Sequence, residues 1–166
     1  MHCGSVDLNM NLVILYPSDF IDPVHVRLND RRFKHLVSVN KVKENDRITC
    51  GLLNGRTGTG LIKKISLDFI KMEICLEHDP PDSLPLTLVL ALPRPKMLKR
   101  IIESVTALGV KNIYLINSWR VEKSFWQSPL LDHDQLEKHM ILGLEQAKDT
   151  VLPKIFQKRF FTRFVK

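Results

Sequence analysis

The sequence predicts an α+β protein of two domains, a small N-terminal β-barrel and a C-terminal α/β domain with a parallel sheet. Short strand-like segments separated by turn residues fill the first half of the chain. The segment Asp79–Pro85 holds three prolines and cannot continue a helix or a central strand. A strand, an amphipathic helix and a second strand follow it. We therefore expect domains at residues 1–79 and 86–166, joined by a linker at residues 80–85.

In the first domain, apolar runs and alternation predict four strands and one short helix. Phe33, Leu36 and Val37 recur at helical spacing, with Asn29 or Asp30 as the N-cap, and predict a helix within Asp30–Val39. The predicted strands are Asn11–Tyr16, Arg47–Leu53, Gly60–Leu67 and Phe69–Leu76.

In the second domain, the pattern changes to a βαβ unit. Leu86–Leu92 is a continuous apolar run, as expected for a strand that is buried on both faces of a parallel sheet. An apolar stripe from Leu98 to Leu108 predicts a helix, and Gly109 stands where its C-terminal cap belongs. The remaining predicted elements are a strand at Asn112–Asn117, a helix capped by Asp132 or Asp134, and a strand at Val151–Phe156 interrupted by Pro153.

The net charge of +7 is unevenly distributed. Residues 1–84 hold 11 Lys and Arg against 11 Asp and Glu, whereas residues 85–166 hold 14 against 7. Within the balanced half, Arg27–Arg47 is locally basic, with seven cations against three acids. Two basic regions are typical either of a polyanion partner or of a merely solvated basic surface.

The chain shows no sign of a membrane or disulfide protein. No run of about 18 apolar residues occurs, and the apolar run near the N-terminus is too short for a signal peptide. Cys3, Cys50 and Cys75 are far apart and form no Cys-x-x-Cys pair, so neither a disulfide framework nor a zinc site is expected. We expect a soluble cytoplasmic protein without a bound metal.

The sequence disfavours three functional interpretations. Gly55–Gly60 is rich in glycine, but strands flank it on both sides, so a β-hairpin is favoured over a phosphate loop. No dinucleotide fingerprint follows Leu86–Leu92, which disfavours a Rossmann-like enzyme. Asp132-His133-Asp134 is explained by helix capping better than by metal ligation, because three consecutive residues rarely converge on one ion.

Two loops follow neighbouring parallel strands and carry the candidate chemistry. Pro93–Lys96 is a stiff loop that supplies Arg94 and Lys96 at a helix start, where cations are disfavoured unless an anion binds nearby. Asn117–Lys123 supplies Arg120, Lys123 and the aromatic Trp119. Cations interleaved with aromatics suit phosphate contact and base stacking. The alternative is that the helix start is simply solvated and that the aromatics pack under the loop or in a dimer interface.

The order of these segments resembles the RsmE family of small-subunit rRNA uridine N3-methyltransferases, which belongs to the knotted SPOUT class. The stretches that carry the resemblance span nearly the whole chain: Arg32–Leu36, Lys41–Asp46, Asn54–Gly58, Ala91–Arg94, Ile101-Ile102, Thr106–Val110, Ser118–Arg120 with Lys123, and Glu145-Gln146 with Pro153.

The resemblance implies a PUA-like barrel, a SPOUT methyltransferase domain, the donor S-adenosyl-L-methionine and a homodimer acting on 16S rRNA of the small ribosomal subunit. The residues expected to contact RNA are Arg27, Arg31, Arg32, His35, Lys41, Arg94, Lys96, Arg120 and Lys123.

The sequence also departs from the family pattern. Trp119 stands in place of the glutamate of a Ser-Glu-Arg motif, and Lys148-Asp149 replaces a Gly-Arg pair. We expect the replacement of that arginine by Asp149 to weaken RNA contact locally. The Gly-Pro-Glu-Gly-Gly and Leu-Gly-x-Arg-Ile-Leu-Arg stretches of the donor-binding knot do not occur in this sequence. We therefore expect a C-terminally truncated chain with an incomplete SPOUT domain, without the donor pocket and inactive alone. The alternatives are a non-catalytic RNA-binding or ribosome-assembly module and a fragment of the enzyme.

Overall fold

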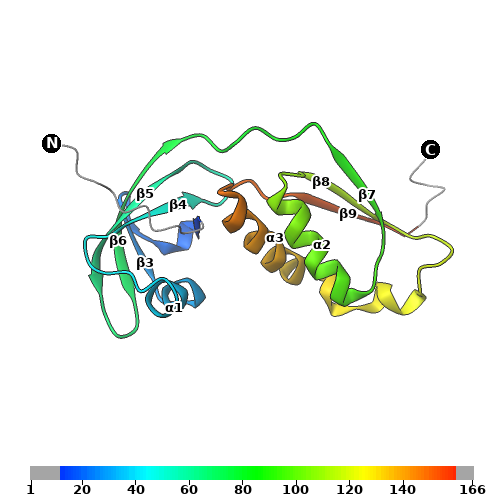
Figure 1. The fold of residues 1–166 in the computed structure, drawn as a ribbon, viewed down its shortest axis with the longest axis horizontal. Coiled ribbons are helices and arrows are strands. Elements are labelled where there is room, and N and C mark those ends of the chain that lie inside the picture. Colours follow the sequence, from blue (N-terminus) through cyan, green and yellow to red (C-terminus); the bar gives the residue numbers. More distant parts are fainter. Residues whose placement is uncertain (1–11, 160–166) are drawn as a thin grey trace. The chain divides into compact units, whose positions relative to one another are not determined.

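The computed structural model describes residues 12–159, which form two compact units (Figure 1). The first unit comprises the chain up to Pro80 together with Lys148–Thr150, and the second comprises Pro81–Ala147 and the chain from Val151 onward. The division between Pro80 and Pro81 falls within the expected linker. The return of Lys148–Thr150 to the first unit is a feature that the sequence did not indicate.

The first unit is built on a six-stranded sheet with the order β1-β4-β5-β6-β3-β2. β1 pairs in parallel with β4, and every other pair is antiparallel. In the described residues the two edge strands do not pair with each other, so the predicted barrel is an open, curled sheet. The elements are β1 (Val13–Leu15), η1 (Pro17–Asp19), β2 (Phe20–Asp22), β3 (His25–Leu28), α1 (Arg31–Ser38), β4 (Arg47–Leu52), β5 (Thr57–Ile65) and β6 (Ile70–His78).

Strand alternation and one helix face build the core of this unit. Ile70, Met72 and Ile74 of β6 are buried because alternate residues of a strand point to the same face of the sheet. Phe33 and Leu36 of α1 pack into the same cluster. The N-cap of α1 is Asp30, whose carboxylate accepts the Arg32 amide at 2.8 Å. Of the two predicted caps, Asp30 is therefore the correct one. The strands β2 and β3 were not predicted, because each is only three or four residues long.

The glycine-rich segment is a β-hairpin, as predicted. β4 and β5 pair in antiparallel register, from Arg47 opposite Leu61 to Gly51 opposite Thr57. Asn54 in the turn has a φ of 58°, a left-handed conformation that asparagine tolerates better than most residues. Gly58 and Gly60 therefore lie in β5, and the segment continues into this strand and not into a helix, as a phosphate loop would require.

The second unit has a three-stranded parallel sheet with the order β7-β8-β9. Gly109 follows α2 with a φ of 83°, and its amide bonds the Thr106 carbonyl, which confirms the predicted glycine cap. The elements are β7 (Thr87–Ala91), α2 (Pro95–Ala107), β8 (Asn112–Ile116), η2 (Lys123–Gln127), η3 (Pro129–Leu131), α3 (His133–Ala147) and β9 (Lys154–Lys158).

Both helices lie on one side of this sheet, packed against each other (Figure 1). Ile113 and Leu115 of β8 are buried on the helix side. On the opposite face, Val89, Tyr114 and Phe156 stand in register across the three strands, and Val89 is 43% exposed. The prediction that Leu86–Leu92 is buried on both faces is therefore wrong for the described residues, because their two helices cover a single face.

The segment Lys148–Thr150 belongs to the first unit through contacts with the β4–β5 hairpin. Asn54 donates its amide to the Thr150 carbonyl at 2.8 Å, and the Thr150 hydroxyl donates to the Gly55 carbonyl. Thr150 is fully buried, and a Cβ at Gly51 would lie only 2.4 Å from its methyl group. Gly51 is thus a glycine because Thr150 occupies the space of a side chain.

The same segment explains the departure at the family's Gly-Arg pair. Lys148 has a φ of 55°, the left-handed conformation that glycine adopts without strain. Asp149 is only 3% exposed. The Asp149 side chain therefore lies inside the first unit and not on its surface, and the expected weakening of RNA contact at this position stays a prediction.

Candidate nucleic-acid interface

The carboxyl edge of the β7–β8–β9 sheet gathers three chain segments of the second unit. Because the three strands are parallel and adjacent, the residues that follow them emerge at the same edge. Pro93–Lys96 follows β7, Asn117–Lys123 follows β8, and Arg159 follows β9. We call these three segments the carboxyl-edge loops.

The first of these loops leads directly into α2. Arg94 occupies the N-cap position, and its carbonyl accepts the amides of Met97 and Leu98. Pro95 opens the helix, where its missing amide hydrogen costs nothing. Arg94 and Lys96 are both exposed, and the first turn of α2 holds no acidic residue. This end of the helix thus presents two cations to solvent, at the position that the sequence predicted.

The second loop presents Trp119, Arg120 and Lys123, all three exposed. The Arg120 guanidinium lies 4.7 Å from the centre of the Trp119 ring, in a cation–π arrangement. The predicted combination of aromatic and cationic side chains is therefore present on the surface at Trp119.

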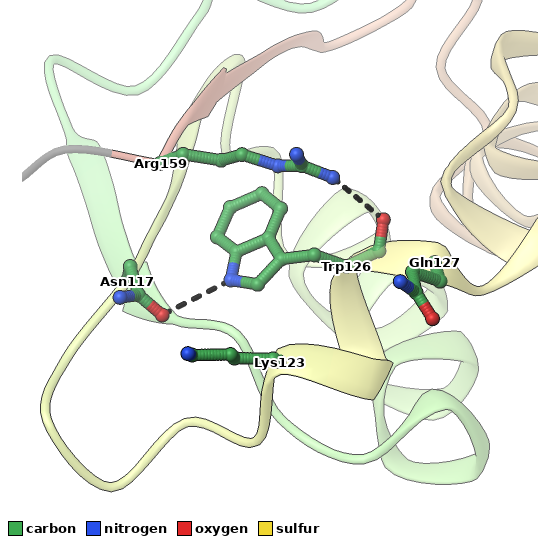
Figure 2. Close-up of a pocket in the computed structure, with 5 residues that line it drawn as sticks. All are labelled: Asn117, Lys123, Trp126, Gln127 and Arg159. Carbon is green, nitrogen blue, oxygen red and sulfur yellow. Dashed lines mark hydrogen bonds between the residues drawn. The ribbon is translucent and has the colours of Figure 1, made fainter.

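A pocket of about 270 Å³ lies between the second loop and the end of β9 (Figure 2). Its floor is the indole of Trp126, whose N–H donates to Asn117 Oδ1 at 3.1 Å. Arg159 covers the ring at 5.4 Å and donates to the Trp126 carbonyl at 2.9 Å. Lys123 and Gln127 complete the lining. The pocket therefore joins two cations, two amides and one aromatic surface.

Of these pocket residues, the sequence predicted only Lys123 as an RNA contact. Asn117 was named only as the start of the loop, and Trp126, Gln127 and Arg159 were missed. Arg159 could have been found, because it directly follows the third parallel strand. Pro153 made that strand look interrupted, whereas β9 in fact begins at Lys154, immediately after this proline.

In the first unit, four side chains that were predicted to contact RNA lie on or beside α1 and β3. Arg31 and His35 are exposed on α1, and Lys41 is exposed just after it with a φ of 53°. Arg27 is half-exposed on β3, lies 4.1 Å above the Phe69 ring and forms an ion pair with Asp68 at 3.8 Å. All four side chains are accessible to solvent.

Arg32 differs from its neighbours because its guanidinium is buried in an ion cluster. It donates to Asp19 at 2.6 and 2.8 Å, to Asp30 at 2.7 Å and to the Ile14 carbonyl at 2.7 Å. Burial alone would lower the pKa of Arg32, but the bonds to Asp19 and Asp30 outweigh it and raise that pKa. With 7% of its surface exposed, Arg32 holds the first unit together and is not placed to contact RNA.

The pocket at the carboxyl edge does not fit S-adenosylmethionine. The donor carries a positive sulfonium, whereas the described residues that line the pocket include the cations Lys123 and Arg159 and no carboxylate. A positive sulfonium would be repelled by these two side chains. No catalytic step is therefore assigned to a donor bound there.

Two further properties concern only the described part of the chain. Within residues 12–159, no group of three or more His, Cys, Asp or Glu side chains is arranged to hold a metal ion. Among the helices of this same region, none is long and apolar enough to cross a membrane.

Comparison with known proteins identifies relatives of both units. A family model described as an RNA methyltransferase domain matches residues 80–166, and one described as an RNA methyltransferase PUA domain matches residues 28–75. The chain is 32% identical over 146 residues to ribosomal RNA small subunit methyltransferase E 1 of Borreliella burgdorferi, covering 88% of this chain and 60% of that protein. It is also 32% identical over 151 residues to ribosomal RNA small subunit methyltransferase E of Treponema pallidum, covering 88% and 56%.

Solved structures share the fold at lower identity. A probable rRNA-methyltransferase from Porphyromonas gingivalis superposes with a TM-score of 0.71 at 19% identity, covering 94% of this chain and 63% of that one. A ribosomal RNA small subunit methyltransferase E from Neisseria gonorrhoeae, bound to S-adenosyl methionine, gives 0.65 at 20% identity, covering 89% and 62%. The chain thus spans about 60% of the length of the relatives it matches.

Proposed function

Because this chain belongs to the RNA methyltransferase family, as the sequence resemblance indicated, we propose that it binds small-subunit ribosomal RNA as part of a uridine N3-methyltransferase. The cationic carboxyl edge of the β7–β8–β9 sheet is the observation that carries this proposal. Arg94, Lys96 and Lys123 are exposed there, and cations on a fixed backbone neutralise phosphates. The exposed side chains of Arg31, His35 and Lys41 in the first unit extend the contact to a second RNA segment.

The role of the described residues in this reaction is to position the RNA. Methylation at N3 of a uridine requires the ring nitrogen to lose its proton and to face the methyl donor in line, so much of the rate comes from orientation. S-adenosyl-L-methionine is the donor in this proposal, and it would bind outside the pocket of Lys123 and Arg159, which repels its sulfonium. The proposal also includes a homodimer acting in the cytoplasm.

The RNA-binding part is tested by titrating the full chain with a 16S rRNA fragment at increasing salt. The logarithm of the affinity should fall linearly with the logarithm of the salt concentration, because bound cations displace counterions. Arg94→Ala and Lys96→Ala should each reduce that slope by about 0.7 to 0.9. Lys138→Ala, an exposed cation of α3 away from the carboxyl-edge loops, is the control and should leave the slope unchanged. Binding without salt dependence would contradict the proposal.

The donor is tested by calorimetry on a longer chain that includes the two knot motifs. Heat of binding for S-adenosylmethionine is expected, and its absence would rule out the methyltransferase assignment.

A second candidate function is a non-catalytic RNA-binding or ribosome-assembly module. The observation that favours it is the set of exposed cations on the carboxyl-edge loops, which can neutralise RNA phosphates without a methyl donor. Methylation of rRNA by the chain as given, measured by transfer of a labelled methyl group, would exclude this alternative.

A further inference from the structure

The two tryptophans of the chain have opposite environments. Trp126 is 9% exposed, its indole N–H is bonded to Asn117, and Arg159 covers its ring. Trp119 is 87% exposed. The sequence places both in one aromatic and basic stretch, and only the structure separates the packed indole from the exposed one.

Trp119 does not stabilise the second unit, because its ring is exposed to water. Removing an indole from water is favourable, so an exposed indole can still contribute this free energy to the binding of a partner. Trp119 lies outside the hydrophobic cluster that joins the helices to the sheet, whereas Trp126, Phe125 and Val121 of the same region belong to it. Its substitution is therefore expected to leave folding unchanged, which makes it a clean probe of binding.

The surroundings of Trp119 define the chemistry of that partner. Arg120 stacks on the ring with its guanidinium 4.7 Å from the ring centre, and Lys123 is three residues further along the same loop. The loop after β7, with Arg94 and Lys96, emerges at the same edge because β7 and β8 are paired neighbours. A flat aromatic surface beside several cations fits a ligand that combines a planar ring with negative charge.

We propose that Trp119 stacks on an unpaired base of the RNA bound at this edge, while Arg120 lies on the ring and reaches the neighbouring phosphate. This inference rests on the proposed function, because it takes RNA as the ligand. An unpaired base exposes its π-face, whereas the bases of a duplex are stacked on one another and offer none. Trp119 therefore distinguishes single-stranded from double-stranded RNA, a selectivity that phosphate contacts alone do not supply.

The experiment compares the full chain with three variants at Trp119 by fluorescence anisotropy of labelled RNA. Trp119→Ala removes the ring, Trp119→Leu keeps an apolar side chain without a π-face, and Trp119→Phe keeps a smaller aromatic ring. Leu108→Ala is the control, because Leu108 is 70% exposed at the opposite end of α2. The probes are a short single-stranded RNA, the same RNA in a duplex, and an abasic oligomer with the same number of phosphates.

Affinity for the single strand should fall about 5- to 150-fold in Trp119→Ala, which is the usual effect of removing one stacking side chain. Trp119→Leu should lose nearly as much, and Trp119→Phe should retain most of the affinity. Binding of the duplex and of the abasic oligomer should be unchanged in all variants, and Leu108→Ala should match the wild type.

The possible failures are distinguishable. If the wild type binds neither the single strand nor the duplex, the proposed function fails and this inference fails with it. If the wild type binds RNA and Trp119→Ala binds all three probes equally well, only the stacking role is overturned. Two further results would overturn the stacking role. One is that Trp119→Leu binds the single strand as tightly as the wild type. The other is that Trp119→Ala loses self-association in sedimentation while its RNA affinity is unchanged, which would assign Trp119 to a protein contact.

Discussion

At the scale of single residues, burial decides which cations are structural and which remain available. Arg31 and Arg32 are adjacent in the sequence, yet Arg31 is exposed and Arg32 is 7% exposed. The difference arises because the Arg32 side chain points to Asp19, which η1 presents beside the end of β1. A complete buried ion cluster adds little to the free energy of unfolding, but removing one charged partner leaves the remaining charges buried without an opposite charge.

We therefore expect Arg32→Ala to destabilise the first unit by about 3 kcal/mol or more, because Asp19 would remain buried without its cation. Urea denaturation of both proteins measures this change. Arg31→Ala is the matched control and should cost less than about 1 kcal/mol. Equal effects of the two substitutions would show that the cluster has no special role.

Asp30 links the same cluster to pH. Burial alone would raise the pKa of its carboxyl, but hydrogen bonds from the side chain and amide of Arg32 outweigh burial and lower that pKa below its ordinary value of 3.8. The stabilisation is therefore present above pH 3.8 and is lost as the pH falls below it. Asp30→Asn should keep the helix cap and remove the charge, so its free energy of unfolding should fall less steeply in acid than that of the wild type. This account would be contradicted if the free energy of unfolding of Asp30→Asn fell as steeply in acid as that of the wild type.

At the scale of elements, close packing of α2 against α3 depends on one glycine. A Cβ at Gly143 would lie 2.6 Å from the Glu103 carbonyl oxygen and 2.7 Å from Thr106 Cβ. The helices also share the His139–Glu103 hydrogen bond at 2.6 Å. The two helices therefore approach each other where α3 has no side chain.

Gly143→Ala tests this packing, because close contact between the helices predicts that the substitution destabilises the protein instead of stabilising it. In an exposed helix the change would stabilise by about 1 kcal/mol, because alanine favours helix. Here we expect destabilisation by about 1 to 3 kcal/mol, because the methyl group must push the helices apart. Thermal unfolding measures the difference, and Lys138→Ala on the exposed face of α3 is the control. A stabilised Gly143→Ala protein would show that the helices are not in close contact.

At the scale of the whole molecule, residues 12–159 form two hydrophobic clusters with no residue in common. One joins the curled sheet to α1, and the other joins α2, α3 and the parallel sheet. Each unit thus has a core of its own, as expected of an independent domain.

Hydrogen exchange should resolve these two cores. Arg32→Ala is expected to accelerate amide exchange in β4, β5 and β6 while leaving β8 unchanged, and Gly143→Ala should do the reverse. The Asn54 amide, which bonds the Thr150 carbonyl within the first unit, should exchange faster in Arg32→Ala and not in Gly143→Ala. Acceleration in both units by either substitution would mean that they unfold together.

The sequence by itself determined most of the longer strands and helices, the hairpin at Asn54-Gly55 and the glycine cap at Gly109, because each follows from local backbone preferences or hydrophobic periodicity. It also placed Arg94 and Arg120 at the same edge, since strand order and direction suffice for that.

Only the tertiary structure decided which side chains are buried. Arg32 lies in a buried ion cluster and Asp149 is buried in the first unit. Trp126 packs beneath Arg159, whereas Trp119 is exposed. Residues distant in the sequence supply those neighbours: Asp19 lies 13 positions from Arg32, and Arg159 lies 33 from Trp126. Local patterns carry no information on such contacts, because burial depends on which distant segments pack together.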